Sequence, residues 1–318
     1  MNAPTEAVAV AVGPGNVDAA LAFAAAEARR TGRPLHLIHV LQLPPGQLPA
    51  SDAYVGVLGG VLDLARATLD EALQKAESLV GEAVPVTDEL VDHGRVADVL
   101  VGHTQLASCL VLQHRALSSV RRAFTGSTTQ RVSSRAHVPV VSVPEGWVPK
   151  DDSSVVTAAV QDPGEAPALL RLAFEEARSR GIGLVVLHAW WLDSGYDVVA
   201  VGDAYRTEQA ARSGEELATV LRPLEREFPD VEVQIMVRHA PPAEALLDAA
   251  EVSDLLVVGR RHHLLPPRTH LGPVARSTLG HASCPVLVVP ERDRSAGSPQ
   301  DTADGTAEVT TTSAGAEL

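Results

Sequence analysis

The feature that most constrains the fold of this chain is an internal repeat. The pair His39-Val40 corresponds to His188-Ala189 at an offset of 149 positions, and Gly126 corresponds to Gly272 at an offset of 146. A period of this length is typical of tandem domains, because the repeats of solenoid proteins run only ~20 to 50 residues. The repeat therefore predicts two copies of one domain.

Each copy alternates short apolar runs with longer amphipathic segments. In the first copy, β-prone runs occupy residues 8–12, 35–40, 85–91 and 109–112, and helical spacing occupies residues 17–30, 63–80 and 96–100. Strands that alternate with helices predict an α/β fold with a parallel sheet and right-handed crossovers.

The length of 318 residues accommodates two domains that each bury a core. We predict a first domain over residues 1–146, a linker over 147–153 and a second domain over 154–291. In residues 292–318, Ser, Thr, Gly, Ala and Asp dominate without apolar periodicity, which predicts a disordered tail.

The charge balance excludes two classes of partner. The formal net charge of −14 repels nucleic acid phosphates and anionic lipids, so neither is expected to bind. The chain begins without a basic segment followed by an apolar one, and no apolar run approaches the ~20 residues of a spanning helix. Cys109 and Cys284 fall in or beside expected buried strands, which suits packing better than a disulfide. We expect a cytoplasmic protein with no membrane attachment.

The most specific motif places glycines around a strand end and a helix start. In the second copy Gly259 ends an apolar run, and Gly272 opens an expected helix after a long loop. In the first copy Gly126-Ser127 occupies the second of these places. A strand that turns into a helix can aim several backbone N–H groups at one anion only where no Cβ intrudes. The spacing of Gly-x-x-Gly, nine residues, then Gly-Ser or Gly-Thr resembles the nucleotide loop of the universal stress protein (UspA) family, and the resemblance covers about residues 7 to 291.

This resemblance implies a fold and a site. It implies two tandem doubly wound domains, each an open parallel five-stranded sheet with helices on both faces, similar to the adenine nucleotide alpha hydrolases. A nucleotide pocket is then expected at the carboxyl ends of the strands, near the reversal of strand order. In family members that bind ATP, an aspartate ends the first strand, backbone groups at the end of the second strand hold adenine, and the glycine loop holds phosphate. The candidate cofactor-binding residues that match these positions are Val40, Gly126, Ser127, Gly259, Arg260 and Gly272.

Both copies depart from the pattern of an ATP-binding member. Counting back from the following helix places Val12 and Gln161 at the two aspartate positions. The glycine loops are altered at four further positions, namely Gln113, Ala116, His262 and Pro273. Valine makes no polar side-chain contact, and proline has no N–H to offer a phosphate. We therefore predict degenerate pockets that bind ATP weakly or not at all.

Positive charge gathers in both loops of this acidic protein. The residues are His114, Arg115, Arg121 and Arg122 in the first copy and Arg260, Arg261, His262, His263 and Arg268 in the second. Arginine binds phosphate through two parallel hydrogen bonds without a glycine loop, so a small anionic ligand is one hypothesis. The alternative, which we favour, is that these residues pair with surface acids or line a domain interface.

No enzyme chemistry can be assembled from the residues. Gly13-Pro14-Gly15 lacks the third glycine of a dinucleotide loop, and the chain has no P-loop. His262, His263 and His270 have no nearby Cys, Asp or Glu that would complete a metal site. We expect no catalytic residue, no metal and no enzymatic activity.

Three functional hypotheses remain, of which we prefer the first. The first is a tandem universal stress protein that acts in stress response as a non-enzymatic binding or regulatory module, with degenerate pockets and an unidentified protein or small anion as partner. The second is an ATP-binding universal stress protein, or an ATP-hydrolysing enzyme of the same superfamily. The third is a protein-interaction scaffold whose pockets are empty.

The last apolar run of each copy predicts how the two copies meet. Val138–Val143 and Cys284–Val289 would each leave an apolar edge bare, so pairing them within one chain covers both. The resemblance implies the same arrangement, because family domains pair through their last strands. We predict an internal pseudo-dimer about a pseudo-twofold axis, able to be monomeric in solution although further association is possible.

Overall fold

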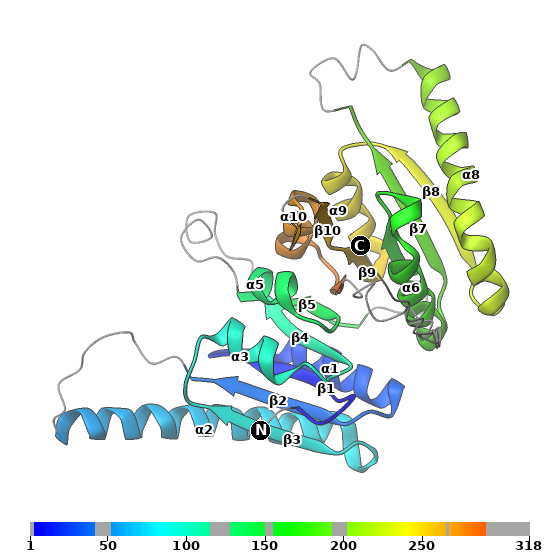
Figure 1. Ribbon diagram of the computed structural model, residues 1–318. Helices are drawn as coiled ribbons and strands as arrows, with labels where there is room; N and C mark the ends of the chain where they lie inside the picture. The colour runs from blue at the N-terminus through cyan, green and yellow to red at the C-terminus, as the bar shows by residue number, and fades with distance from the viewer. Residues whose placement is uncertain are drawn as a thin grey trace, which may run out of the picture.

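Two five-stranded halves join into one ten-stranded sheet in the computed structural model, which describes residues 3–41, 52–114, 128–149, 155–192, 202–264 and 267–290. The strand order is β3-β2-β1-β4-β5-β12-β9-β6-β7-β8 (Figure 1). The strands of the first half are β1 Val8–Val12, β2 Leu35–Val40, β3 Val86–Val91, β4 Cys109–His114 and β5 Val140–Pro144. Those of the second half are β6 Val155–Ala159, β7 Leu184–Trp190, β8 Val233–His239, β9 Ser253–Gly259 and β12 Val286–Val289.

Each half has the doubly wound topology that the resemblance implied. All strand pairs within a half are parallel, and the strand order reverses between β1 and β4 in the first half and between β6 and β9 in the second. The helices of the first half are α1 Asp18–Thr31, α2 Asp52–Val80, α3 Val96–His103 and α5 Thr128–Arg135. Those of the second half are α6 Pro167–Arg180, α8 Asp203–Glu227, α9 Pro242–Val252 and α10 Pro273–His281, and two short 3-10 turns are η1 Gly81–Ala83 and η2 Pro163–Glu165.

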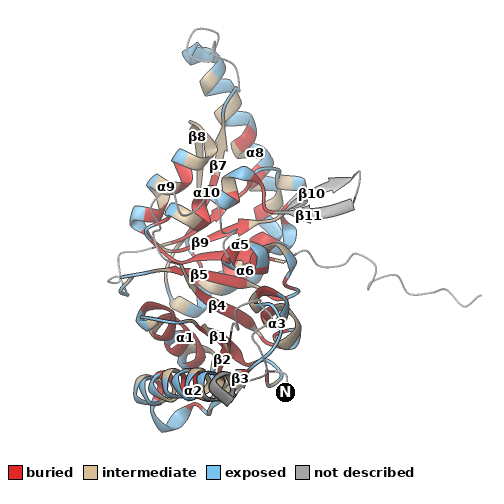
Figure 2. Ribbon diagram, turned by 90° about the vertical axis from the view of Figure 1, so that its left-hand side faces the viewer, coloured by how far each residue is buried: buried red, intermediate tan, exposed pale blue. Residues whose placement is uncertain are grey.

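The two halves meet through their last strands. β5 and β12 pair antiparallel, with Val141 opposite Leu287 and Val288 opposite Val140. All four side chains are buried, because this seam lies in the middle of the sheet (Figure 2). The predicted pairing of the two last strands is therefore confirmed.

The helices cover the two faces of the sheet unequally. On one face, α1 and α2 of the first half and α6 and α8 of the second share a single apolar core that crosses the seam. On the other face, α3 and α5 enclose one smaller core, and α9 and α10 enclose another. The sheet is thus buried on both sides, which explains why most of its strands are apolar without alternation.

A buried ion cluster joins the halves where α1 and α6 approach each other. Arg180 lies 3.1 Å from Glu176, 3.4 Å from Glu27 and 3.2 Å from Asp254. Arg30 pairs with Glu27 on its own helix and lies 3.2 Å from Glu176 across the axis. The side chains in this cluster are at most 21% exposed, so the charges are screened little by water.

Two elements differ from the sequence prediction. Helix α2 begins at Asp52, eleven residues before the expected start, and the segment expected to be a long loop after Gly259 contains an antiparallel hairpin. This hairpin consists of β10 Arg261–Leu264 and β11 Pro267–His270. β-Strand pairing satisfies backbone groups that a loop leaves to water, so a largely polar segment of this length can form a hairpin although it has few apolar residues.

Candidate functional site

The doubly wound topology creates one crevice per half, at the carboxyl ends of the strands where the order reverses. In the first half it lies between the turns that follow β1 and β4, and in the second half between the turns that follow β6 and β9. Of the positions considered from the sequence, Val12, Gln113 and Gly259 lie at the strand ends that flank these crevices. Their contents decide what either half can bind.

Neither first strand ends in a side chain that could contact a nucleotide sugar. Val12 is buried at the end of β1, and its carbonyl oxygen accepts a hydrogen bond from Nδ1 of His39 at 2.7 Å. In the second half the same histidine-to-backbone bond joins His188 to the carbonyl oxygen of Val160 at 3.0 Å. Val160, and not Gln161, is therefore the counterpart of Val12. Counting from the helix was wrong by one residue because the turn between β6 and α6 is one residue longer than the turn between β1 and α1.

Asp162, which directly follows Gln161, is used locally. The carboxylate of Asp162 accepts a hydrogen bond from the backbone N–H of Gly164 at 2.8 Å and so caps η2. An Asx cap of this kind is a common way to fix a turn.

The first crevice is bridged by Gln113, the last but one residue of β4. Its Oε1 accepts a hydrogen bond from the N–H of Ala20 in the first turn of α1, at 3.1 Å. Its Nε2 donates to the carbonyl oxygen of Asn16 at 2.7 Å. A helix N-terminus offers free N–H groups to anions, and here one of them is already satisfied from within the chain. The side chain that replaces the first loop glycine thus ties the two walls of the crevice together.

The second crevice is closed by an apolar contact instead. Gly259 occupies the place of Gln113, and a Cβ atom built on it would lie 3.2 Å from Cδ1 of Leu169. Leu169 is buried in the first turns of α6, at the place that Ala20 has in α1. A side chain at this position would press on Leu169, so the leucine from the helix favours a glycine here without any phosphate.

The remaining glycine-loop positions divide between described and undescribed residues. Gly272 directly precedes α10, and its carbonyl oxygen accepts the N–H of Arg276 at 3.0 Å. Pro273 follows as the first residue of the helix and has no N–H to donate. Gly126 and Ser127, together with Ala116, lie outside the described residues.

The candidate positions at the ends of the second strands lie within paired strands. Val40 ends β2 and pairs with Val91, and Ala189 in β7 pairs with Arg238. Both Val40 and Ala189 are half-buried and pack against the apolar cores of their halves.

The basic residues at the ends of β4 and β9 lie at the junction of the two halves. Arg260 donates a hydrogen bond from its guanidinium to the carbonyl oxygen of Ala136 in the first half, and β11 lies beside α5. Its counterpart His114 lies 3.0 Å from Oγ of Ser142, and burial, with His281 as a second cause, lowers the pKa of His114 to about 4. The predicted basic residues Arg115, Arg121 and Arg122, and the side chains of Arg261, His262, His263, Arg268 and His270, lie outside the part described.

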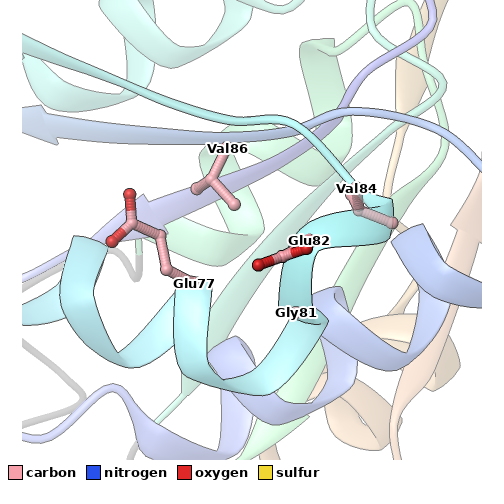
Figure 3. Close-up of a pocket in the computed structure, with 5 residues that line it drawn as sticks. All are labelled: Glu77, Gly81, Glu82, Val84 and Val86. Carbon is pink, nitrogen blue, oxygen red and sulfur yellow. The ribbon is translucent and has the colours of Figure 1, made fainter.

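A hollow of about 340 Å³ lies at the opposite edge of the first half. Its lining residues are Glu77, Gly81, Glu82, Val84 and Val86 (Figure 3). Val86 is the first residue of β3, so the hollow lies at the amino ends of the strands and is distinct from both crevices.

The described residues also show how far the structure supports metal binding, membrane crossing and thiol reactivity. Among them, no three His, Cys, Asp or Glu side chains are grouped to hold a metal ion, and no helix has both the length and the apolar character to cross a membrane. Cys109 and Cys284 are buried and form no disulfide, and burial raises the pKa of the Cys109 thiol, which disfavours the reactive thiolate.

Sequence reasoning missed the two bridging contacts and an aromatic group at the end of β7. Gln113 was noticed as a lost glycine, yet its partners Asn16 and Ala20 lie more than 90 positions away. For the aromatic group a signal was present, because Trp190 and Trp191 are adjacent in a chain that has only three tryptophans.

Fold and crevices define a class, the tandem doubly wound α/β proteins with one switch-point site per half. Comparison with known families matches residues 5–144 and 154–290 to the Universal stress protein family. A universal stress protein of Mycolicibacterium smegmatis is 30% identical over 277 residues, which cover 86% of this chain and 93% of that protein. One from Mycobacterium tuberculosis is 30% identical over 220 residues, which cover 68% of each chain. The chain belongs to the universal stress protein family.

Solved structures show the same fold. A universal stress protein from Archaeoglobus fulgidus aligns with a TM-score of 0.60 at 17% identity and covers 90% of this chain and 97% of its own. A putative universal stress protein from Pseudomonas aeruginosa aligns with a TM-score of 0.55 at 16% identity, covering 90% and 93% of the two chains. The predicted family and fold are therefore confirmed.

Proposed function

We propose that this chain is a non-enzymatic binding or regulatory module of the universal stress protein family, in which neither crevice binds ATP in the manner of the family's ATP-binding members. The observation that carries the proposal is that side chains of the protein itself span both crevices. Gln113 does so by two hydrogen bonds, and Leu169 does so by its contact at Gly259.

The loss of polar contacts supports the same proposal. Val12 and Val160 present isopropyl groups where an ATP-binding member has a carboxylate. Without that contact, a ribose hydroxyl would lose its hydrogen bonds to water and gain none from the protein, which costs about 1–3 kcal/mol for an unsatisfied polar group. A ligand would also have to displace Gln113 from its partners or Leu169 from its core.

We further propose that the internal pairing of β5 with β12 makes the chain a pseudo-dimer that needs no second copy to cover its last strands. Cytoplasmic action fits two buried cysteines that form no disulfide, because thiols stay reduced in that compartment. The partner is then an unidentified protein or a small anion.

Calorimetric titration of the full chain with ATP tests the proposal. The expected result is no heat of binding or a Kd far above 1 μM. A sub-micromolar Kd, which corresponds to more than about 8 kcal/mol, would refute degenerate pockets. Gln113→Ala opens the first crevice and should raise the ATP affinity if the bridge is what blocks it. Gln74→Ala removes an exposed glutamine from α2 and should change nothing.

Phosphate release from ATP separates this proposal from the hydrolase hypothesis. With magnesium and excess ATP, release should match a blank that contains no protein. Turnover above that blank, lost in a Gly272→Trp variant that still folds, would favour the enzyme.

A further inference from the structure

Helix α2 presents an apolar strip to solvent along the outer edge of the first half. Val57 is 62% exposed and Leu64 is 68% exposed, and Gly60 and Ala67 are exposed beside them. The four residues follow one another at intervals of three, four and three positions, which keeps them on one face of the helix. The N-terminal part of α2 also extends past the strands of its own half (Figure 1). Exposing such a strip to water is unfavourable, so packing within the chain does not explain it.

The corresponding helix of the second half, α8, has a charged face in place of this strip. The buried leucines align the two helices, because Leu69 of α2 corresponds to Leu217 of α8 at an offset of 148 positions. The counterparts of Gly60, Leu64 and Ala67 are then charged and exposed, namely Glu208, Arg212 and Glu215. The two helices lie at opposite ends of the molecule (Figure 2). The fold therefore accepts an ordinary solvated face here, and the apolar strip is a property of α2 alone.

Two adjacent glycines inside α2 provide a second observation. Glycine is less favourable than alanine in a helix interior, so Gly59 and Gly60 weaken the helix. A Cβ atom built on either one would meet no heavy atom within 4 Å, so no contact among the described residues requires a glycine there. Gly214 of α8 is also open, so a glycine by itself identifies no surface. Gly60 differs because it leaves space in an apolar strip, one turn before the exposed side chain of Leu64.

The charge of the chain restricts what can cover this strip. Two copies of a protein with a net charge of −14 repel each other through their charged faces. Residues 53–62 of α2 carry no charged side chain, whereas the corresponding residues 201–210 contain Asp203, Arg206 and Glu208. A second copy can therefore approach α2 with less repulsion than it meets at α8.

The strip is also complementary to itself. A twofold axis makes each contact between two copies reciprocal. In an antiparallel pairing about an axis at Leu62, Leu64 of each copy faces Gly60 of the other. Val57 of each copy then faces Ala67. A large side chain thus meets a small one at every position, which is what packing of ridges into grooves requires.

We propose that the strip of Val57, Gly60, Leu64 and Ala67 is a dimerisation surface, and that its occupant is the same strip of a second copy of this chain. The contact is separate from both crevices and from the seam between β5 and β12. Two strips of about three turns each form an interface at or below the lower end of specific interfaces, about 1,200 Å². The dimer is therefore weak, with a Kd expected in the range of about 1 to 100 μM.

Asp63 gives this pairing a signature of its own. It is exposed and lies one position from the axis, so the two Asp63 carboxylates of a dimer approach each other. Asp63→Asn removes their repulsion and should tighten the dimer by about two- to threefold. Glu225→Gln removes the same charge from an exposed position of α8 and should leave the Kd unchanged.

Sedimentation velocity of the full chain over a range of concentrations tests the proposal, and the wild type should show a reversible monomer–dimer equilibrium. Leu64→Gln should weaken the dimer by at least about tenfold, because each copy loses a side chain at the centre of the interface. Leu106→Gln removes a 57% exposed leucine elsewhere in the first half and is the matched control, which should keep the wild-type Kd. Gly60→Glu gives α2 the residue of α8 and should abolish the dimer without lowering the melting temperature, because glutamate favours a helix more than glycine does.

Three outcomes would overturn the proposal. The first is a chain that stays monomeric at millimolar concentration. The second is a dimer whose Kd is unchanged in Leu64→Gln or in Gly60→Glu, which would place the association elsewhere. The third is a monomer that binds neutral phospholipid vesicles through Leu64, which would assign the strip to a lipid surface. The ATP titration of the crevices is unaffected by these results, so the two proposals can fail separately.

Discussion

Each of the two crevices of this molecule is closed by one side chain, and these two side chains come from opposite walls. In the first half a long side chain on the strand, Gln113, reaches a small residue on the helix, Ala20. In the second half a glycine on the strand, Gly259, admits a large residue from the helix, Leu169. The comparison teaches that the closure of a crevice depends on a pair of facing residues, one on the strand and one on the helix, and not on either residue alone. A glycine at the loop position is therefore no sign of an open phosphate site when the helix has filled the space.

The ion cluster between α1 and α6 likewise uses different positions in the two halves for the same kind of residue. Arg30 of α1 corresponds to Ser179 of α6, and Arg180 of α6 corresponds to Thr31 of α1. Each helix thus brings one arginine, at a different position, to carboxylates that both helices share. If both helices carried an arginine at the position of Arg30 and Ser179, two positive charges would lie side by side, because these two side chains are in contact. The ion cluster is therefore not symmetric, although the two glutamates Glu27 and Glu176 occupy corresponding positions.

The largest effect is expected at the seam that the two halves share. Val141→Asp with Val288→Asp places two carboxylates in a fully buried strand pair, where they have no partners. We expect a loss of more than about 5 kcal/mol in the free energy of unfolding and separation of the halves. Small-angle scattering and thermal unfolding measure both. The control, Leu106→Asp with Val148→Asp, changes two exposed apolar side chains and should leave both unchanged, whereas a compact double mutant with the wild-type melting temperature would exclude this interface.

The next largest effect is expected at Arg180, one of the two arginines that α1 and α6 bring to the ion cluster from different positions. Arg180→Ala leaves the buried carboxylates of Glu27, Glu176 and Asp254 with one guanidinium, and the arginine side chain is only 9% exposed. Removing one partner of a buried ion cluster costs about 3–5 kcal/mol. Chemical denaturation should show this loss, and Thr31→Ala, at the corresponding position of α1, should cost less than about 1 kcal/mol. Equal costs for the two variants would mean that the cluster adds nothing beyond ordinary packing.

The sequence was sufficient for the fold because the repeat and the alternation of strands with helices act locally. It also located both crevices, since Gly259 ends a strand in the second copy and the repeat gives the corresponding position, Gln113, in the first. It could not show the bridge from Gln113 to Ala20, because that contact depends on where β1 and β4 lie side by side. It misplaced the counterpart of Val12 because one extra residue in a turn shifts every position counted across it. His239 joins Trp190 only through the register of β7 and β8, so the aromatic group at the end of β7 could not be assembled either.

A smaller effect tests whether the two crevice closures are interchangeable. Gly259→Gln gives the second half the strand residue of the first, but its Cβ would press on Leu169 at 3.2 Å. Overpacking of this kind costs about 1–3 kcal/mol. Adding Leu169→Ala recreates the pair of the first half and should recover part of that cost, giving a coupling of about 0.5–3 kcal/mol in a double-mutant cycle. Strictly additive costs would show that the two residues do not act as a pair.

The smallest effect concerns the residues that follow the bridging pair, His114 in the first half and Arg260 in the second. Burial, with His281 as a second cause, lowers the pKa of His114 from 6.5 to about 4, so the folded chain binds fewer protons than the unfolded chain between these values. The free energy of unfolding therefore falls as pH drops through this window, and the stability is full above pH 6.5. Between pH 7 and pH 5 we expect a loss of about 2 kcal/mol that His114→Gln abolishes and that the exposed His93→Gln control keeps. Denaturation curves at the two pH values decide this, because an equal pH dependence in wild type and His114→Gln would show that His114 is not held neutral. Arg260 stays charged at both pH values, so it gives the second half no such pH dependence. The two corresponding residues, His114 and Arg260, would then differ in whether they make the stability depend on pH.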